Sequence, residues 1–377
     1  MSRFYKTIII GAGPAGLIAG KHLCDALILD EKKEIGRPVQ CGEGISKNAL
    51  AMQGIKPNDD WICCKVHKVE RIMPNGKTVG RFHKDSIGYV IDREKFEKCL
   101  TRDIKAEIRL NVKVMSLRTR GDLWEVTTES GEKFKAKCII GADGSSSIVR
   151  RKIFPENQNK TEFIPAIEYL IETKKELDVN TLKIYLNNEK YNHGYAWIFP
   201  KSKNIANIGA CGQGNFSKEF KRFLEEVVKK NYGDYNILEN RSGNIPVANI
   251  SQCKVYRSKV FLIGDAAGLA DPIFKGGISQ AMMSGKIAAE CILENSYDFY
   301  EAKIKAMPFA NVKLIKARDI LYGLDNDIIN EFGKIFKENS SFLKKIFIIA
   351  AKPNLRKNFF KIFRFFLVWK KEHNYLW

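Results

Sequence analysis

The stretch that decides the fold is Thr7-Ile8-Ile9-Ile10-Gly11-Ala12-Gly13-Pro14-Ala15-Gly16. Its first four residues suit a short buried strand, and the glycine spacing that follows, Gly-x-Gly-x-x-Gly, is typical of a strand that turns directly into a helix. We expect the helix to run through about Leu23, and Ala26–Leu29 to form a second strand. This order of strand, turn, helix and strand predicts the opening of a dinucleotide-binding fold.

Each glycine of this turn has its own expected purpose: a tight bend, close approach of the backbone to a pyrophosphate, and packing of the helix on the strand. Asp30 ends the second strand and is predicted to hold a ribose hydroxyl, with Glu31 as the weaker alternative. A glycine turn that binds nothing is the competing interpretation. The predicted cofactor contacts here are Gly11, Gly13, Ala15, Gly16 and Asp30.

Two further turns follow apolar strands later in the chain. One comes after Cys138–Ile140 and the other after Val260–Ile263, and the second leads into a helix expected over about 279–293. Either turn alone is ordinary, but three of them in this order favour a single FAD site. The residues assigned to it from these turns are Asp143, Gly144, Gly264, Asp265, Gly276, Gly277 and Ile278.

The remaining pattern predicts an α/β (α+β) chain: a Rossmann-like FAD-binding domain, an interleaved β-rich substrate domain and a helical C-terminal segment. Residues 108–137 are predicted as a β-meander, residues 165–214 as strands, and residues 216–230 as an amphipathic helix. The FAD domain is assigned to 1–60, 93–165 and 250–295, the substrate portion to 61–92 and 166–249, and the basic helical segment to 296–377.

Composition excludes several classes of protein. The chain has 377 residues with 45% hydrophobic and 28% charged residues, as in ordinary globular proteins. Its nine cysteines lack the spacing Cys-x-x-Cys, which favours reduced thiols in a cytoplasmic protein, and its five histidines show no metal-ligand spacing. No apolar run reaches the roughly 18 residues that a membrane-spanning helix needs.

The net charge of +20 favours an anionic partner. Near the C-terminus an apolar stripe at helical spacing is surrounded by lysine and arginine, which predicts peripheral association with an anionic membrane surface. A helix docked on the protein's own core is the alternative. Nucleic acid is not expected, because no nucleic-acid-binding module is present. The stripe consists of Phe359, Ile362, Phe363, Phe366 and Leu367.

Over about residues 5–295 the chain resembles the FAD-dependent hydroxylase-like superfamily, and within it the geranylgeranyl reductase family. The resemblance rests on the three turns, on the segment 38–46 that contains Cys41 and Gly42, and on the spacing Tyr-x-Trp-x-Phe-Pro with a glycine after eight residues. It implies saturation of prenyl C=C bonds on a lipid such as digeranylgeranylglycerophospholipid, by hydride transfer from reduced FAD. The implied substrate residues are Tyr195, Trp197, Phe199, Pro200 and Gly209.

Cys41 is the predicted catalytic residue, because reduction of a C=C bond needs a proton and a thiol is still protonated at neutral pH. Shaping the pocket, or simple burial, are the other interpretations. The resemblance also suggests that Cys41, Gly42, Arg37 and Arg93 contact the cofactor; the alternative for each arginine is a solvated side chain. One departure is Lys275, which stands where the family has a glycine in the flavin loop.

Two other functions share these motifs: an FAD-dependent monooxygenase of the aromatic-hydroxylase type, and a membrane-associated flavoprotein of unassigned reaction. A second nucleotide fold is not evident in the sequence. The expected reductant is therefore NAD(P)H as a transient visitor or a ferredoxin.

Overall fold

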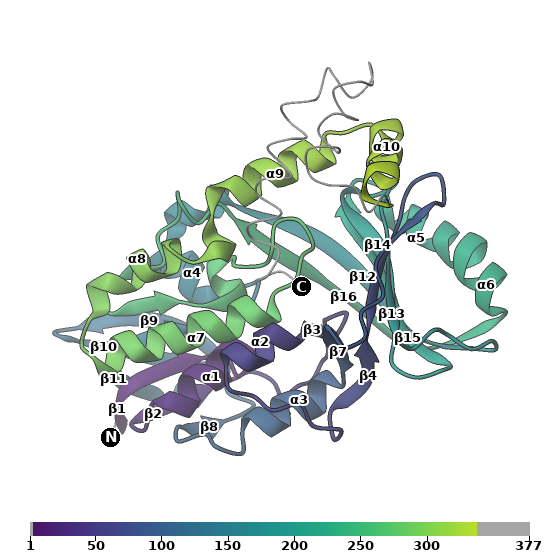
Figure 1. The fold of residues 1–377 in the computed structure, drawn as a ribbon. Coiled ribbons are helices and arrows are strands. Elements are labelled where there is room, and N and C mark those ends of the chain that lie inside the picture. The colour runs from purple at the N-terminus through teal and green to yellow at the C-terminus, as the bar shows by residue number, and fades with distance from the viewer. Residues whose placement is uncertain (1–2, 338–377) are drawn as a thin grey trace.

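The computed structural model describes residues 3–337 and places the opening strand at the centre of a sheet with the order β17-β18-β11-β1-β2-β8 (Figure 1). Strands β18, β11, β1, β2 and β8 run parallel, and the apolar run of β1 is buried on both faces, as in other parallel sheets. Helices α1 and α7 pack against each other on one face. The bounds are β1 Arg3–Ile10, α1 Pro14–His22, β2 Ala26–Leu29, β8 Glu107–Arg109, β11 Lys133–Gly141, β17 Tyr256–Arg257, β18 Val260–Leu262 and α7 Ile278–Leu293.

The predicted meander is confirmed for three of its strands. Strand β9 (Val114–Arg120) pairs with β10 (Leu123–Thr128), and β10 pairs with β11, all antiparallel. Only the start of the predicted range differs, because residues 108 and 109 belong to β8, which pairs with β2. This three-residue strand, Glu107-Ile108-Arg109, forms the edge of the parallel sheet instead.

The second sheet has the order β16-β12-β15-β14-β13-β5-β6 and is mostly antiparallel. One face is covered by the helical segment 216–232, which confirms the predicted helix, although its middle turn is a π-helix. The other face contains the aromatic residues of β14. The bounds are β5 Lys68–Ile72, β6 Thr78–Val79, β12 Thr161–Thr173, β13 Thr181–Tyr185, β14 Asn192–Pro200, β15 Ile205–Gln213, α5 Phe216–Phe223, η2 Leu224–Lys229, α6 Lys230–Tyr232 and β16 Tyr235–Ala248.

A small third sheet has the order β3-β7-β4. Along the chain, its strands come between strands of the two large sheets. Helix α3 begins directly after β7, with the Asp92 side chain accepting a hydrogen bond from Lys95 N as an N-cap. The bounds are β3 Gly44–Ser46, α2 Lys47–Met52, β4 Ile62–Val66, β7 Gly88–Ile91 and α3 Arg93–Leu100.

After α7 the chain continues through helices that run from the first sheet to the second, where α10 lies over β6 (Figure 1). Their bounds are α8 Tyr300–Lys305, α9 Val312–Tyr322 and α10 Asn326–Lys337. The predicted stripe at 359–367 lies outside the described residues. Within residues 3–337, no helix combines the length and apolar character that crossing a bilayer requires.

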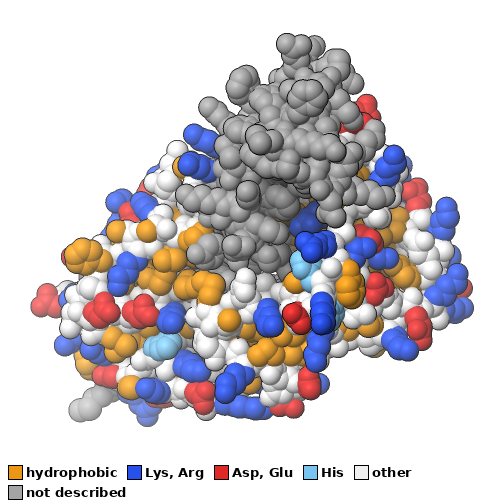
Figure 2. All heavy atoms as spheres, in the orientation of Figure 1, with side chains coloured by type: hydrophobic (Ala, Val, Ile, Leu, Met, Phe, Trp, Pro, Cys, Tyr) orange, Lys and Arg blue, Asp and Glu red, His pale blue; other side chains and the backbone are white. Residues whose placement is uncertain are grey.

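The predicted fold class is therefore confirmed, while the assigned domain boundaries remain predictions. Lysine and arginine side chains are spread over the described part of the face in Figure 2 rather than gathered at one place. The net charge therefore does not identify a docking surface on this face.

Candidate active site

The three predicted turns meet at one edge of the first sheet. Ile10 is in register with Gly141, and Gly141 with Leu262, so the loops after β1, β11 and β18 start side by side. Contacts between loops confirm the closeness: a Cβ added to Gly11 would lie 2.2 Å from Ala142 O. The carboxyl ends of neighbouring parallel strands are where α/β sheets bind ligands.

The first turn fits a pyrophosphate. Gly11 has a φ of +109°, which favours glycine, and a Cβ on Gly16 would lie 1.9 Å from Gly11 O. A Cβ on Gly13 meets nothing within 4 Å, so this glycine keeps an open space at the N-terminus of α1. Free N–H groups and the helix dipole make such a space suitable for phosphate.

Asp30 is buried directly after β2, and its carboxylate stabilises the turn through hydrogen bonds. Its Oδ2 accepts a hydrogen bond from Ala12 N at 2.5 Å, and its Oδ1 accepts one from Lys32 N at 2.7 Å. The carboxylate therefore holds the glycine loop in shape at the place where the sequence predicts a ribose contact.

Asp143 has a structural task in the second turn. Its carboxylate accepts hydrogen bonds from Ser147 Oγ at 2.6 Å and Ile148 N at 2.7 Å, at the start of α4 (Ile148–Ile153). These bonds satisfy groups that the first turn of a helix leaves unpaired. Gly144 beside it has a φ of +72° and nothing within 4 Å of an added Cβ.

The third turn brings Asp265 close to the N-terminus of α7. A Cβ added to Gly277 would lie 3.4 Å from Asp265 Oδ1, and one added to Gly276 would meet nothing within 4 Å. Burial raises the pKa of Asp265, against the lowering effect of Arg93 and Arg150. Gly264 lies in this turn, and Ile278 is the first residue of α7.

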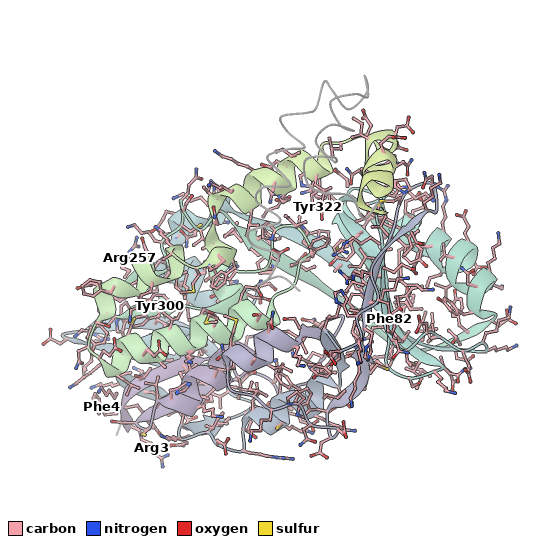
Figure 3. All side chains as sticks on the ribbon, viewed as in Figure 1. Arg3, Phe4, Phe82, Arg257, Tyr300 and Tyr322 are labelled. Carbon is pink, nitrogen blue, oxygen red and sulfur yellow. The ribbon has the colours of Figure 1, made fainter. Side chains whose placement is uncertain are left out.

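Lys275 adopts a left-handed backbone with a φ of +60°, a conformation that favours glycine. Its buried Nζ donates to Pro272 O at 2.6 Å and lies 4.9 Å from the centre of the Tyr322 ring on α9, the tyrosine labelled in Figure 3. Burial lowers the pKa of Lys275 to about 8. The lysine thus links the loop before α7 to α9.

The Cys41 loop lies against the aromatic strand of the second sheet. A Cβ added to Gly42 would lie 3.2 Å from the Phe199 ring and 3.4 Å from Trp197 Nε1. Burial raises the pKa of the Cys41 thiol, against the lowering charge of Arg93, so the thiol is protonated at neutral pH.

The aromatic strand β14 has the two faces that the sequence predicts. Tyr195, Trp197 and Phe199 join one core cluster, whereas Ala196 and Ile198 join the other, under α5. The Tyr195 hydroxyl donates to Phe274 O in the loop before α7. Trp197 Nε1 is buried and has no hydrogen-bond partner among the described residues, so it is a donor available to a ligand or water.

The glycine of the aromatic motif lies directly opposite its tryptophan. Gly209 on β15 is the register partner of Trp197, and a Cβ there would lie 2.3 Å from Trp197 Cζ2. The eight residues between Pro200 and Gly209 therefore set the length of a hairpin in which the Trp197 indole packs on a residue that has no side chain.

The two candidate arginines differ. Arg93 is largely buried, donates to Glu97 Oε1, and its charge acts on both Cys41 and Asp265, which places it where the two sheets meet. Arg37 is 55% exposed and pairs with Glu94 on the surface at 2.6 Å. The sequence cannot separate them, because burial is decided by packing.

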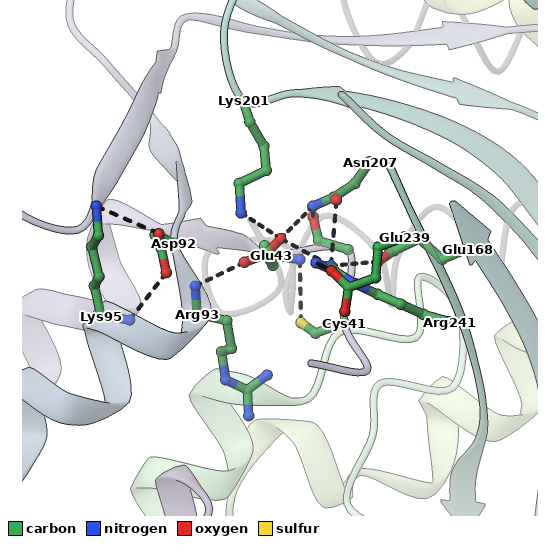
Figure 4. A network of polar contacts seen from close by, with 11 residues as sticks. Cys41, Glu43, Asp92, Arg93, Lys95, Glu168, Lys201, Asn207, Glu239 and Arg241 are labelled. Atoms are coloured by element: carbon green, nitrogen blue, oxygen red, sulfur yellow. Dashed lines mark hydrogen bonds and ion pairs between the residues drawn. The ribbon is translucent and has the colours of Figure 1, made fainter. Parts of the chain in front are cut away.

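A group of buried polar residues was missed from the sequence. Glu43 directly follows the Cys41–Gly42 pair, and it contacts side chains from β15 and β16 (Figure 4). Its only sequence signal was its place in the segment 38–46. The others show no local pattern, because they come together across strands: Glu168, Lys201, Asn207, Glu239 and Arg241.

Comparisons with known proteins identify the family of this chain. The family model described as the geranylgeranyl reductase catalytic domain matches residues 162–245, which run from β12 to β16 of the second sheet. Digeranylgeranylglycerophospholipid reductase 1 of Methanococcoides burtonii is 32% identical over 77% of this chain and 76% of its own length. The digeranylgeranylglycerophospholipid reductase of Methanocaldococcus jannaschii is 30% identical over 94% of this chain and 97% of its own length.

Among solved structures, a geranylgeranyl bacteriochlorophyll reductase-like protein from Thermoplasma acidophilum superposes with a TM-score of 0.82 and 25% identity, over 95% of this chain and 99% of that one. The glycine turns have the shape and the open backbone that FAD requires. With relatives at 30% identity or more over most of its length, the chain belongs to the geranylgeranyl reductase family and is an FAD-dependent oxidoreductase.

Proposed function

We propose that this protein saturates C=C bonds in the prenyl chains of a lipid of the digeranylgeranylglycerophospholipid type. The observation that carries the proposal is the packing of the Cys41–Gly42 loop on Trp197 and Phe199, next to the loop that Tyr195 contacts. This packing places a protonated thiol beside an aromatic surface, near the turns that are proposed to bind the flavin. Prenyl chains offer no hydrogen-bonding groups, so an aromatic surface suits them.

Each residue then has a physical task. The Gly11–Gly16 turn and the N-terminus of α7 would hold the phosphates and one edge of the flavin, and FAD supplies the hydride when reduced. Cys41 holds a proton at Sγ for the second carbon of the double bond. The aromatic face of β14 orients the chain and excludes water.

The test is anaerobic incubation of dithionite-reduced protein with a geranylgeranyl lipid, followed by mass spectrometry. We expect a gain of two mass units for each reduced bond. Cys41→Ser should retain FAD and slow the reaction by ~10²–10⁴, the range for a lost general acid. A hydroxylated product that requires oxygen would assign the protein to the monooxygenases instead, and an unimpaired Cys41→Ser variant would leave the thiol to packing.

For the reductant we propose NAD(P)H or a ferredoxin. Bleaching of the flavin absorbance under anaerobic mixing with each donor in turn distinguishes them. The donor that reduces the flavin faster than the lipid is reduced is then identified as the physiological reductant.

We further propose that the protein binds an anionic membrane through its basic C-terminal segment. Removal of the residues after Asn339 should leave the FAD content unchanged and weaken binding to phosphatidylglycerol liposomes. Binding of the full chain should fall with salt, because part of the attraction is electrostatic. Equal binding by both forms would contradict this proposal.

A further inference from the structure

A buried glutamate, Glu43, directly follows the Cys41–Gly42 pair and lies between the small third sheet and the second sheet (Figure 4). Its backbone O accepts a hydrogen bond from Ile91 N on β7 at 2.9 Å. Its Oε1 accepts one at 2.7 Å from the backbone N of Arg93, the first residue of α3. These two contacts hold Glu43 against the third sheet and the helix that follows it.

The other carboxylate oxygen of Glu43 faces the second sheet. Three side chains donate to Oε2, from the residue after β14, from β15 and from β16: Lys201 at 2.7 Å, Asn207 at 2.7 Å and Arg241 at 3.2 Å. Asn207 also donates to Gly42 O at 3.3 Å. Charge-assisted hydrogen bonds from several directions fix the position of a carboxylate. Glu43 is therefore anchored to two sheets at once.

The backbone of Glu43 is left-handed, with a φ of +63°. A residue with a Cβ adopts this conformation at a cost in free energy, and such strain persists only where the surroundings impose it. The anchored side chain and the hydrogen bond to the backbone O supply that constraint. The result is a backbone N–H that donates to Cys41 Sγ, with 3.2 Å between the nitrogen and the sulfur.

This N–H···S contact suits a proton donor in two ways. The sulfur accepts the hydrogen bond, so its place is fixed without use of the S–H proton, which remains available to a ligand. A donor aimed at the sulfur also stabilises the thiolate more than the thiol, because the charged form is the stronger acceptor. The contact therefore favours release of the proton from Cys41.

We propose that Glu43 is the positioning residue for Cys41, and that its anchored left-handed turn directs its own N–H at Sγ. This hydrogen bond fixes the sulfur beside the aromatic face of β14, which Gly42 contacts, and it stabilises the thiolate that remains after each proton transfer. The inference rests on the proposed reduction of prenyl chains. Glu43 acts through Cys41 and is not assigned contact with the substrate.

The proton balance of the step is closed by water. When a hydride adds to one carbon of the double bond, the S–H bond of Cys41 breaks and a C–H bond forms at the other carbon. The electron pair of the broken bond stays on the sulfur as a thiolate, which accepts the N–H of Glu43. Water then returns a proton to the sulfur, and the hydroxide passes to bulk solvent. Cys41 is thus a thiol again before the next bond is reduced.

Several charges besides the Glu43 N–H influence the acidity of Cys41. Burial raises the pKa of the thiol most, the charge of Arg93 on α3 lowers it, and the charges of Glu168 on β12 and of Glu43 itself raise it. Tyr195 faces the thiol from β14 and is neutral, because burial raises the pKa of its hydroxyl well above its usual value. A comparison that isolates the N–H has to leave these charges equal.

Two variants of Glu43 meet this condition. Glu43→Gly and Glu43→Ala remove the same carboxylate, so they change the charge near Cys41 equally. Glycine adopts a φ of +63° without strain, whereas alanine does not. Without the anchor, the alanine variant should leave the left-handed conformation and turn its N–H away from Sγ, while the glycine variant keeps it. The rate of iodoacetamide modification of Cys41 is measured against pH in the FAD-bound protein, by mass spectrometry.

The Cys41 profile of Glu43→Ala should lie at higher pH than that of Glu43→Gly by roughly one unit, which corresponds to one hydrogen bond to a charged group. Glu239→Gln is the control, because Glu239 accepts from Arg241 Nη2 whereas Glu43 accepts from Nη1. Its profile should match wild type. FAD content reports whether each variant is folded. Equal profiles for the glycine and alanine variants would overturn the proposal.

A second measurement keeps Glu43 and its anchor intact, and it decides the question if the Glu43 variants fail to bind FAD. Hydrogen exchange of backbone amides is compared in wild type and Cys41→Ala, at single-residue resolution by fragmentation mass spectrometry. The Glu43 amide should exchange about tenfold faster in Cys41→Ala, because its acceptor is gone. The Ile91 and Arg93 amides, which donate to Glu43, should be unchanged. Acceleration at all three amides, or at none, would contradict the contact.

The third test uses the lipid and separates chemistry from binding. In Glu43→Ala, kcat should fall by on the order of 10²-fold, as for a misplaced reacting group, while KM stays within about twofold of wild type. Glu43→Gly should lose less of kcat. A higher KM with an unchanged kcat would assign Glu43 to lipid binding and reject the positioning role. Absence of lipid reduction by wild type would reject the proposed function, and the thiol profiles and amide exchange would still decide the role of Glu43.

Discussion

In the first sheet the site is formed by backbone at the ends of β1, β11 and β18, whereas in the second sheet it is formed by side chains in the middle of β12, β14, β15 and β16. The first region needs glycine and open N–H groups, and it would accept any ligand with the right phosphates. The second region needs particular acids, bases and aromatic rings. We infer that the first sheet fixes the cofactor class, and that the second sheet fixes the reaction.

The largest expected effect is on the first sheet. Gly13→Val should remove FAD almost completely, because the added side chain fills the open space at the N-terminus of α1. The fold should survive, since a Cβ at this position meets nothing within 4 Å. Flavin absorbance and circular dichroism measure the two effects separately. A folded, yellow Gly13→Val protein would break the assignment of this turn to the pyrophosphate.

A matched control sharpens this prediction. Gly16→Ala places its Cβ 1.9 Å from Gly11 O, so this variant should lose stability rather than flavin alone. If both variants lose flavin while keeping the wild-type melting temperature, the distinction between space for a ligand and space for the backbone is wrong.

In the second sheet two glycines should differ in how strongly substitution lowers the stability. Gly209→Ala should cost about 1–3 kcal/mol of the free energy of unfolding, because its Cβ would overlap the Trp197 ring. Gly243→Ala on β16 should change the free energy by no more than ~0.5 kcal/mol, since the nearest atom lies 3.8 Å from its Cβ.

Urea unfolding of the FAD-bound proteins gives both values. Lipid binding should weaken in Gly209→Ala as well, because the indole has to move. Equal stability of the two variants would contradict the packing of Trp197 on Gly209.

The smallest effect should come from Arg37, which the sequence could not tell from Arg93. Arg37→Ala should change stability by about 0.2–1 kcal/mol and leave FAD affinity unchanged, because its pair with Glu94 is exposed. Titration of apoprotein with FAD measures the affinity. A marked loss of affinity would return Arg37 to the cofactor site, and the surface pair would then be incidental.

The sequence by itself determined the cofactor half of this protein. Backbone sites need glycine at fixed spacing, and an apolar strand before each turn fixes where the turn lies, so Gly11–Gly16 and Gly264–Asp265 could be placed from local pattern. The two faces of β14 were also predictable, because side chains alternate along any strand.

Only the tertiary structure decided the chemistry around Cys41. Glu168 and Arg241 are 73 positions apart in the sequence, and they meet because they are register partners on the paired strands β12 and β16. A register is set by the whole sheet and leaves no mark at either residue. Burial likewise separated Arg93 from Arg37, and it follows from packing rather than from local pattern.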